Sequence, residues 1–240
     1  MKTPVERLSL RKRLALEAFR QMRENRKKLH PLKQLFWECT QRCNVHCKHC
    51  GSDCKRTTHI PDMPAEDFLR VVDSLTPHVN PHEVNIIITG GEPLVRDDLE
   101  QVGLALYRRG YPWGMVTNGL YLTAERLQSL SAAGLHAITV SLDGFADDHN
   151  WLRGHPDSYD RAMNAIRLLA QEREVKWDIV TCVNRRNYPY LEQFKDALYE
   201  AGVRRWRLFT IFPVGRAARY PEFQLDDRDF KGLMDFIRRT

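Results

Sequence analysis

The sequence lacks a run of 18 apolar residues, which excludes an ordinary transmembrane helix. Residues 1–28 carry charge throughout and have no apolar block of the kind that a secretory signal needs. Cysteine is scarce, with 6 in 240 residues, and none follows Cys182. We therefore expect a cytoplasmic protein, in which clustered cysteines serve as metal ligands or redox groups before they serve as disulfides.

Excess positive charge is confined to the N-terminal segment. The net charge is +6, and residues 1–32 hold 10 Lys and Arg against 3 Asp and Glu, whereas the remainder holds 27 against 28. The main part of the chain therefore gives no reason to expect a nucleic-acid partner. Residues 4–29 have the spacing of a basic amphipathic helix, and Pro31 is expected to end it. We expect this helix to lie against the main domain; peripheral contact with an anionic membrane surface or an acidic peptide remains an alternative.

From residue 33 the chain alternates between strand-like and helix-like segments. The expected strands are 33–39, 83–89, 113–117, 135–141, 175–183 and 203–211. The expected helices are 64–76, 97–109, 123–133, 158–171, 188–201 and 226–239. Six such units in about 180 residues predict an α/β fold, a partial (β/α)6 TIM-like barrel with an N-terminal helix, because a full eightfold barrel needs about 250 residues. A doubly wound open sheet is the alternative.

Three regions follow from this alternation. Residues 1–32 form a basic N-terminal helix, residues 33–216 form the barrel core, and residues 217–240 form a C-terminal helix that begins a further region. The 240-residue length is enough for one domain with an appendage.

Unusual residues cluster where the expected strands end. Cys43, Cys47 and Cys50 follow the first strand at the spacing Cys-x3-Cys-x2-Cys, and Gly90-Gly91-Glu92-Pro93 follows the second. Thr117-Asn118-Gly119 follows the third strand, and Ser141-Leu142-Asp143-Gly144 follows the fourth. Because ligands bind at the carboxyl ends of strands in parallel α/β folds, these segments predict one shared site.

The residues alone leave the chemistry of this site open. Three thiolates at this spacing suit an iron–sulfur cluster, but Cys54 would complete a four-thiolate zinc site. Gly90 and Gly91 suit either a tight turn or a ligand-binding loop, with Glu92 able to pair with an ammonium group. Arg153 is either a solvated loop residue or a guanidinium that holds a carboxylate.

Taken together and in order, these motifs resemble the radical S-adenosylmethionine (radical SAM) superfamily over residues 33–216. Within it, the chain is similar to the branch of anaerobic sulfatase maturases and peptide-modifying enzymes, whose core usually precedes a cysteine-rich SPASM domain with auxiliary clusters. No cysteine after Cys182 supplies such a domain here.

The resemblance implies two cofactors, a [4Fe–4S] cluster and SAM, and assigns residues to each. It implies that Cys43, Cys47 and Cys50 ligate three irons and leave the fourth iron to SAM. It further implies that six residues bind SAM. Gly90, Gly91 and Glu92 would receive its ammonium group, Ser141 and Arg153 would contact its ribose and carboxylate, and His49 would lie by its adenine. The reaction implied is reductive cleavage of SAM to a 5′-deoxyadenosyl radical that abstracts hydrogen from a substrate.

The expected substrate is a peptide or protein, with a small molecule, for instance a tetrapyrrole, as the alternative. A flavodoxin or ferredoxin is the expected electron donor. No general acid or base is assignable from the sequence. A metal-binding scaffold without turnover is the alternative from a different functional class.

Overall fold

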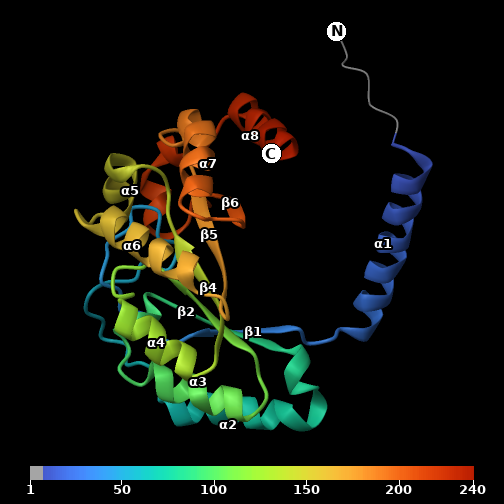
Figure 1. Cartoon of the computed structure of the whole chain (residues 1–240), viewed down its shortest axis with the longest axis vertical. Coiled ribbons are helices and arrows are strands. Elements are labelled where there is room, and N and C mark those ends of the chain that lie inside the picture. The colour runs from blue at the N-terminus through green and yellow to red at the C-terminus, as the bar shows by residue number, and fades with distance from the viewer. Residues whose placement is uncertain (1–7) are drawn as a thin grey trace. The chain divides into compact units, whose positions relative to one another are not determined.

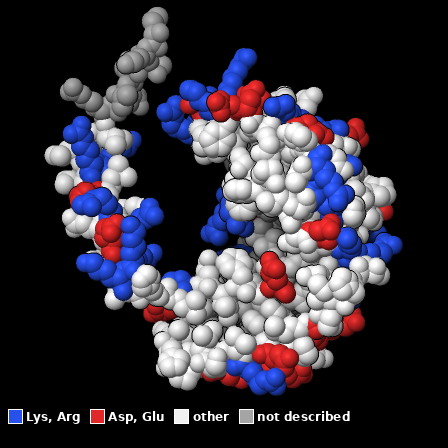
Figure 2. Space-filling view, turned by 180° about the vertical axis from the view of Figure 1, so that it is seen from behind, with Lys and Arg blue, Asp and Glu red and all other residues white. Residues whose placement is uncertain are grey.

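The computed structural model describes residues 8–240 and forms two compact units, residues 1–33 and residues 34–240. In the first unit α1 (Leu10–Leu29) begins after Ser9, whose hydroxyl accepts a hydrogen bond from Lys12 N, and ends at His30 in a left-handed conformation. The helix was predicted over residues 4–29, of which residues 4–7 lie outside the described residues, and in the described part it begins at Leu10. Every residue of α1 is exposed, and Lys and Arg side chains line it in Figure 2. Its predicted packing against the main domain stays a prediction.

The second unit is built on one parallel sheet that curves into part of a barrel (Figure 1). Its strands are β1 (Gln34–Glu38), β2 (Asn85–Thr89), β3 (Trp113–Thr117), β4 (Leu135–Ser141), β5 (Lys176–Val183) and β6 (Trp206–Thr210). They are hydrogen-bonded in the order β1-β2-β3-β4-β5-β6. Sequential order throughout is what right-handed βα crossovers around a barrel produce. The predicted partial (β/α)6 barrel is therefore confirmed, and the doubly wound alternative is wrong.

Helices cover the outer face of this sheet, as Figure 1 shows. They are α2 (Ala65–Leu75), α3 (Leu99–Arg108), α4 (Ala124–Ala132), α5 (Ala146–Arg153), α6 (Ser158–Gln171), α7 (Leu191–Glu200) and α8 (Asp227–Arg239). Short 3-10 turns are η1 (Thr76–His78), η2 (Pro81–Glu83), η3 (Pro93–Val95), η4 (Tyr188–Tyr190), η5 (Gly215–Arg219) and η6 (Pro221–Phe223). The helix α5 was expected as a loop, because its eight residues carry charge and little apolar periodicity.

The core lies between the sheet and these helices. Ile86 and Ile88 of β2 are fully buried, as are Ile138 and Val140 of β4. Their β-branched side chains fit a parallel sheet that is covered on its outer face. Alternation along the strands therefore fixes which side chains reach the inner, open face.

The last helix, α8, belongs to the same unit as the barrel. Leu233 and Phe236 of α8 are buried and pack with Val183 of β5 and Leu191 of α7. Asp226 caps the helix by accepting a hydrogen bond from Asp229 N. Phe230, Met234 and Ile237 of the same helix are exposed, so α8 packs on the sheet through Leu233 and Phe236.

Candidate functional site

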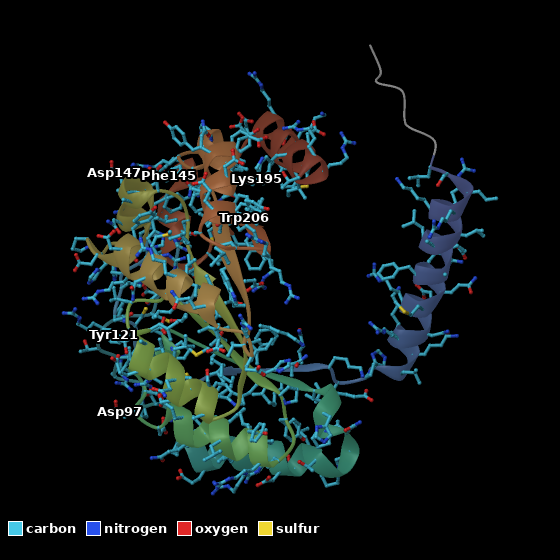
Figure 3. All side chains as sticks on the ribbon, viewed as in Figure 1. Asp97, Tyr121, Phe145, Asp147, Lys195 and Trp206 are labelled. Carbon is cyan, nitrogen blue, oxygen red and sulfur yellow. The ribbon has the colours of Figure 1, made fainter. Side chains whose placement is uncertain are left out.

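One cavity of about 170 Å³ lies where β1 to β4 end. Figure 3 labels Asp97, Tyr121 and Phe145, which follow β2, β3 and β4 and lie along one side of the unit. The nine predicted site residues all line this cavity: Cys43, Cys47, His49, Cys50, Gly90, Gly91, Glu92, Ser141 and Arg153. The structure therefore brings together predicted residues from the ends of β1, β2 and β4, with Thr117 and Asn118 at the end of β3 between them, and their individual roles stay predictions.

The cysteine loop is closed on itself by backbone hydrogen bonds. Arg42 and Lys55 form an isolated parallel bridge, in which Cys43 N donates to Lys55 O over 2.8 Å. The loop is also held by α5, since His46 N donates to Arg153 O and Lys48 N donates to Leu152 O. These hydrogen bonds consequently fix the loop of residues 43–54, and its cysteine thiols line the same cavity.

The thiols of this loop are largely removed from water. Cys43 and Cys47 are buried, and burial raises the pKa of Cys43 to about 12. The pKa of Cys50 is lowered to about 5, chiefly because the Cys54 thiol hydrogen-bonds to it. Iron ligation requires thiolates, so metal binding must offset the cost of deprotonating the buried pair.

The spacing of the thiols argues against a single zinc ion. Thiolates on one tetrahedral zinc lie about 3.8 Å apart, given Zn–S bonds of about 2.3 Å. Within residues 8–240 only His49, Asp143 and Cys182 form a trio whose donor atoms all lie within 4.8 Å of one another, so no three loop thiols do. A cubane cluster binds each thiolate to a different iron and tolerates the wider spacing. The donor set therefore fits the cluster better than zinc.

Gly90 and Gly91 are required by a close backbone approach. Gly91 N donates to Thr40 O over 2.7 Å, and Glu92 N donates to Arg42 O over 2.9 Å. A Cβ on Gly90, which has φ +131°, would lie 2.4 Å from Thr40 O, and one on Gly91 would lie 2.1 Å from Arg42 O. Any larger residue would push the cysteine loop away. Because the Gly91 and Glu92 amides already donate to this loop, the segment has carbonyl and carboxylate oxygens left to offer to a ligand. An ammonium group needs such hydrogen-bond acceptors.

Glu92 is a fully buried carboxylate that joins the ends of β2 and β3. Its Oε1 accepts from Thr117 Oγ1 at 2.7 Å and Leu94 N at 3.1 Å, and its Oε2 accepts from Asn118 N at 2.8 Å. Burial raises the pKa of Glu92 despite these donors. A cationic ligand in the cavity would favour its charged form. The carboxylate is thus both a structural tie and an acceptor for a cation.

Arg153 is a buried guanidinium held by a buried carboxylate. Its Nε donates to Asp143 Oδ2 over 2.7 Å, and its Nη1 lies 3.7 Å from Cys47 Sγ. Burial is the largest single influence on the pKa of Asp143 and would raise it, but the Arg153 charge, His49, His149 and the hydrogen bond from Cys182 N together hold that pKa below its usual value. Asp143 thereby fixes a positive charge beside the thiols, where a carboxylate would bind.

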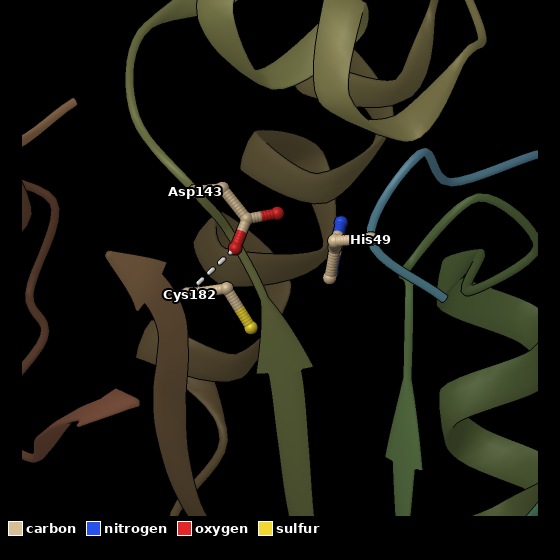
Figure 4. A group of neighbouring side chains, drawn as sticks. All are labelled: His49, Asp143 and Cys182. Atoms are coloured by element: carbon tan, nitrogen blue, oxygen red, sulfur yellow. Dashed lines mark hydrogen bonds between the residues drawn. The ribbon is translucent and has the colours of Figure 1, made fainter. Parts of the chain in front are cut away.

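His49, Asp143 and Cys182 lie close together beside this ion pair (Figure 4). A metal ion there is disfavoured, because Asp143 Oδ2 accepts from Arg153 and Oδ1 accepts from Cys182 N at 2.8 Å. Burial lowers the pKa of His49 to about 4, and its Nδ1 has no partner among the described residues. A neutral His49 therefore presents a flat ring and an unpaired polar atom to the cavity region.

Arg216 reaches the back of the cysteine loop from beyond β6. Its guanidinium donates to Cys47 O at 2.7 Å, Cys54 O at 2.9 Å and Asp53 Oδ1 at 2.8 Å. Its backbone N donates to Cys50 O. A single buried arginine thus satisfies several loop carbonyls that would otherwise face the interior unpaired.

Several of these contributors were not predicted. Asn118 and Asp143 belong to the strand-end segments but were given no role of their own, and residue 216 entered only as the end of the barrel core. Their position at strand ends was the available signal. Their partners lie 10 to 169 residues away in sequence, which no local pattern reveals.

Comparison with known proteins now decides the family. The sequence profile described as Radical SAM superfamily matches residues 37–198. The chain belongs to the radical SAM superfamily. This family binds a [4Fe–4S] cluster and SAM, so these are the cofactors of the chain, and the residues around the cavity are those that would hold them.

Curated radical SAM relatives include an AdoMet-dependent heme synthase of Oleidesulfovibrio alaskensis. It is 30% identical over 204 residues, which are 85% of this chain and 52% of the relative. A PqqA peptide cyclase of Ruegeria pomeroyi is 26% identical over 183 residues, 76% of this chain and 48% of the relative. The chain therefore spans about half the length of the curated relatives it matches.

Solved structures share the radical SAM fold. Streptococcus suis SuiB bound to S-adenosylmethionine has a TM-score of 0.68 at 17% identity, over 98% of this chain and 55% of SuiB. Native anSMEcpe with bound AdoMet has a TM-score of 0.71 at 20% identity, over 86% of this chain and 60% of that protein. The predicted resemblance to this branch is confirmed at the level of the fold. Among the described residues, no helix combines the length and the apolar character needed to cross a bilayer.

Proposed function

We propose that this chain is the core of a radical SAM enzyme that cleaves SAM reductively and abstracts hydrogen from a polypeptide substrate. The observation that carries the proposal is the shared cavity, in which three cysteines, a buried carboxylate and a buried guanidinium meet. When bound, the reduced cluster supplies the electron that splits SAM into methionine and a 5′-deoxyadenosyl radical, which takes a hydrogen atom from the substrate.

The protein's own contribution is to bind, orient and exclude water. Cys43, Cys47 and Cys50 hold the cluster. Arg153, which lies beside the Cys47 thiol, receives the SAM carboxylate. Glu92 and the carbonyls of the Gly90-Gly91 segment receive the ammonium. Ser141 contacts the ribose and His49 lies by the adenine. The burial of these groups supports a water-excluding site, in which their electrostatic contacts are strengthened.

The inner face of the barrel beside the cavity favours a polypeptide. Trp37 stacks on Phe68 of α2, so its neighbours Phe36 and Glu38 point to the inner face, where they are exposed. Glu38 is in register with Thr89, which lines the cavity. An aromatic ring and an acidic group suit a peptide side chain, whereas a carboxylate-bearing tetrapyrrole would be repelled by Glu38.

A tetrapyrrole substrate is the second candidate. The observation in its favour is the 30% identity to an AdoMet-dependent heme synthase and 26% identity to an Fe-coproporphyrin III synthase of Methanosarcina barkeri. The inner face also carries Arg207 of β6, although its guanidinium is engaged by Asp178. This candidate requires that Arg207 be released to meet a carboxylate.

The deciding experiment is anaerobic reconstitution followed by SAM cleavage. Wild-type protein should bind about four irons and release 5′-deoxyadenosine with dithionite, and Cys47→Ala should do neither. Deuterated peptide digest and deuterated iron-coproporphyrin are then offered separately, and deuterium in 5′-deoxyadenosine identifies the substrate class. Transfer of deuterium from the porphyrin and not from the peptides would overturn the polypeptide proposal. Zinc binding without SAM cleavage would overturn the proposal that the protein is an enzyme.

The physiological setting proposed is the cytoplasm, with a flavodoxin or ferredoxin as electron donor. For the basic helix α1, with Arg26, Lys27 and Lys28 in its last turn, we propose packing against the main domain, with peripheral contact with an acidic surface as the alternative. Replacing dithionite by reduced flavodoxin or ferredoxin in the same assay tests the donor. Cleavage that occurs with dithionite but with neither protein would reject the donor proposal.

A further inference from the structure

Cys54 is a fourth buried thiol in the cysteine loop. It is 4% exposed and packs in one apolar cluster with Cys43, Val45 and Cys47, against which Cys50 also packs. It lines the same cavity as the three expected ligands. Buried cysteines are ordinarily inert small apolar residues, as Cys39 is in the core beneath β1. Cys54 differs from Cys39 because its surroundings are other thiols.

The backbone of residue 54 is held in place from both sides. On one side Asp53 takes a left-handed conformation, with φ 50°, which turns the chain back toward the cavity. On the other side Lys55 is bridged to Arg42. Arg216 fixes the turn itself through Asp53 Oδ1 and Cys54 O. These contacts fix the backbone on both sides of Cys54 and so hold its thiol beside the other loop thiols.

The charge at the site also suits a fourth thiolate. Two buried guanidinium groups contact the loop at Cys47, Arg153 near its Sγ and Arg216 at its carbonyl. Each added thiolate makes a cluster more negative, and buried cations offset that charge in a low-dielectric interior. Before SAM binds, the fourth iron has neither the SAM amino group nor the SAM carboxylate as a ligand, and Cys54 lines the same cavity with a thiol, the soft donor that iron–sulfur clusters select.

We propose that Cys54 is an exchangeable fourth ligand, which binds the open iron of the cluster when SAM is absent and is displaced when SAM binds. On binding, the thiol loses its proton to solvent and an iron–sulfur bond forms. On displacement, the SAM ammonium loses one proton, its amino nitrogen and the SAM carboxylate take the iron in place of the sulfur, and the Cys54 thiolate takes up a proton. No change of oxidation state is involved. The inference rests on the proposed function and adds a protein residue that protects the fourth iron.

The test compares anaerobically reconstituted wild type, Cys54→Ala, Cys54→Ser and Cys39→Ala. Each protein is oxidised briefly with ferricyanide, with and without SAM, and examined by iron analysis and by EPR for a [3Fe–4S] signal. Without SAM, we expect wild type and Cys39→Ala to retain about four irons and the Cys54 variants about three. With SAM bound, all four proteins should retain the fourth iron equally.

SAM affinity gives a second readout that a structural role would not produce. If the thiolate occupies the iron in about nine of ten molecules, Cys54→Ala should bind SAM about tenfold more tightly, because no ligand has to be displaced. Circular dichroism of the cluster-free proteins checks that the variants fold.

Equal iron retention in wild type and both Cys54 variants without SAM would overturn the proposal. Loss of the fourth iron from the variants even with SAM bound would also overturn it, since Cys54 would then be a permanent or structural residue. Unchanged or weaker SAM binding by Cys54→Ala has the same consequence. Wild type that holds four irons but never cleaves SAM would instead contradict the proposed function.

Discussion

Asparagine in place of Asp143 removes the negative charge that faces the buried Arg153 guanidinium. The Arg153 Nε and Asp143 Oδ2 atoms are 2.7 Å apart, and their side chains are 9% and 0% exposed. Removing one partner of such a pair leaves an uncompensated buried charge and costs about 3–5 kcal/mol of unfolding free energy. The asparagine oxygen can still accept from Cys182 N, so the loss reports the missing charge together with the hydrogen bond from Arg153 Nε.

The assay is urea denaturation of the cluster-free protein under reducing conditions, followed by circular dichroism. Asp178→Asn is the matched control, because Asp178 pairs with Arg207 but the arginine is 47% exposed. We expect that control to cost about 0–1 kcal/mol. Adding Arg153→Met to Asp143→Asn should recover much of the stability, because both charges are then absent.

Equal losses in Asp143→Asn and Asp178→Asn would refute the reasoning, since burial would then make no difference to the pair. Failure of the added Arg153→Met to recover stability would show that the unpaired cation is not the cause. Asp143→Asn alone should also weaken SAM binding, because Arg153 loses the carboxylate that orients it. Isothermal titration of the reconstituted protein measures this.

Three further predictions use other contacts of the site. Gly91→Ala should reduce cluster loading severalfold, measured as iron per protein, because its Cβ would lie 2.1 Å from Arg42 O; Gly51→Ala, whose Cβ would meet only a side chain at 3.3 Å, should load normally, and equal loading would contradict this. Arg216→Met should lower the unfolding free energy by about 3 kcal/mol through buried loop carbonyls left unpaired, whereas a loss under 1 kcal/mol in urea denaturation would exclude that role. The stability gap between wild type and Asp143→Asn should stay constant from pH 7 to about 4 and close as pH falls further, because the folded pKa of Asp143 lies below its unfolded value of about 3.9; a gap that closes by pH 6 would argue against this sign.

The sequence alone located the site because its unusual residues directly follow the expected strands. Continuous β-branched segments and intervening amphipathic helices gave the parallel βα order, and that order places the carboxyl end of every strand at one rim. Cys43, Glu92 and Ser141 were therefore predicted to meet although they lie far apart in the chain. The cavity that they line confirms that they meet.

The helix α5 and the N-terminal boundary of α1 could not be read in the same way. The eight residues of α5 hold His149, Leu152 and Arg153 buried among charged neighbours, so the apolar period is weak. Its position is instead fixed by tertiary contacts, such as Lys48 N donating to Leu152 O. A short helix of this kind is stabilised by what it touches more than by its own propensity.

What the sequence by itself determined is the alternating fold, the family motifs and the set of residues that gather at the rim. Only the tertiary structure decided their partners: Asp143 for Arg153, Arg216 for the back of the cysteine loop, and a buried position for Cys54 among the ligand thiols. The physical reason is that periodicity records which face of an element is buried, whereas a hydrogen bond or ion pair depends on side chains brought within about 3 Å by the packing of distant segments.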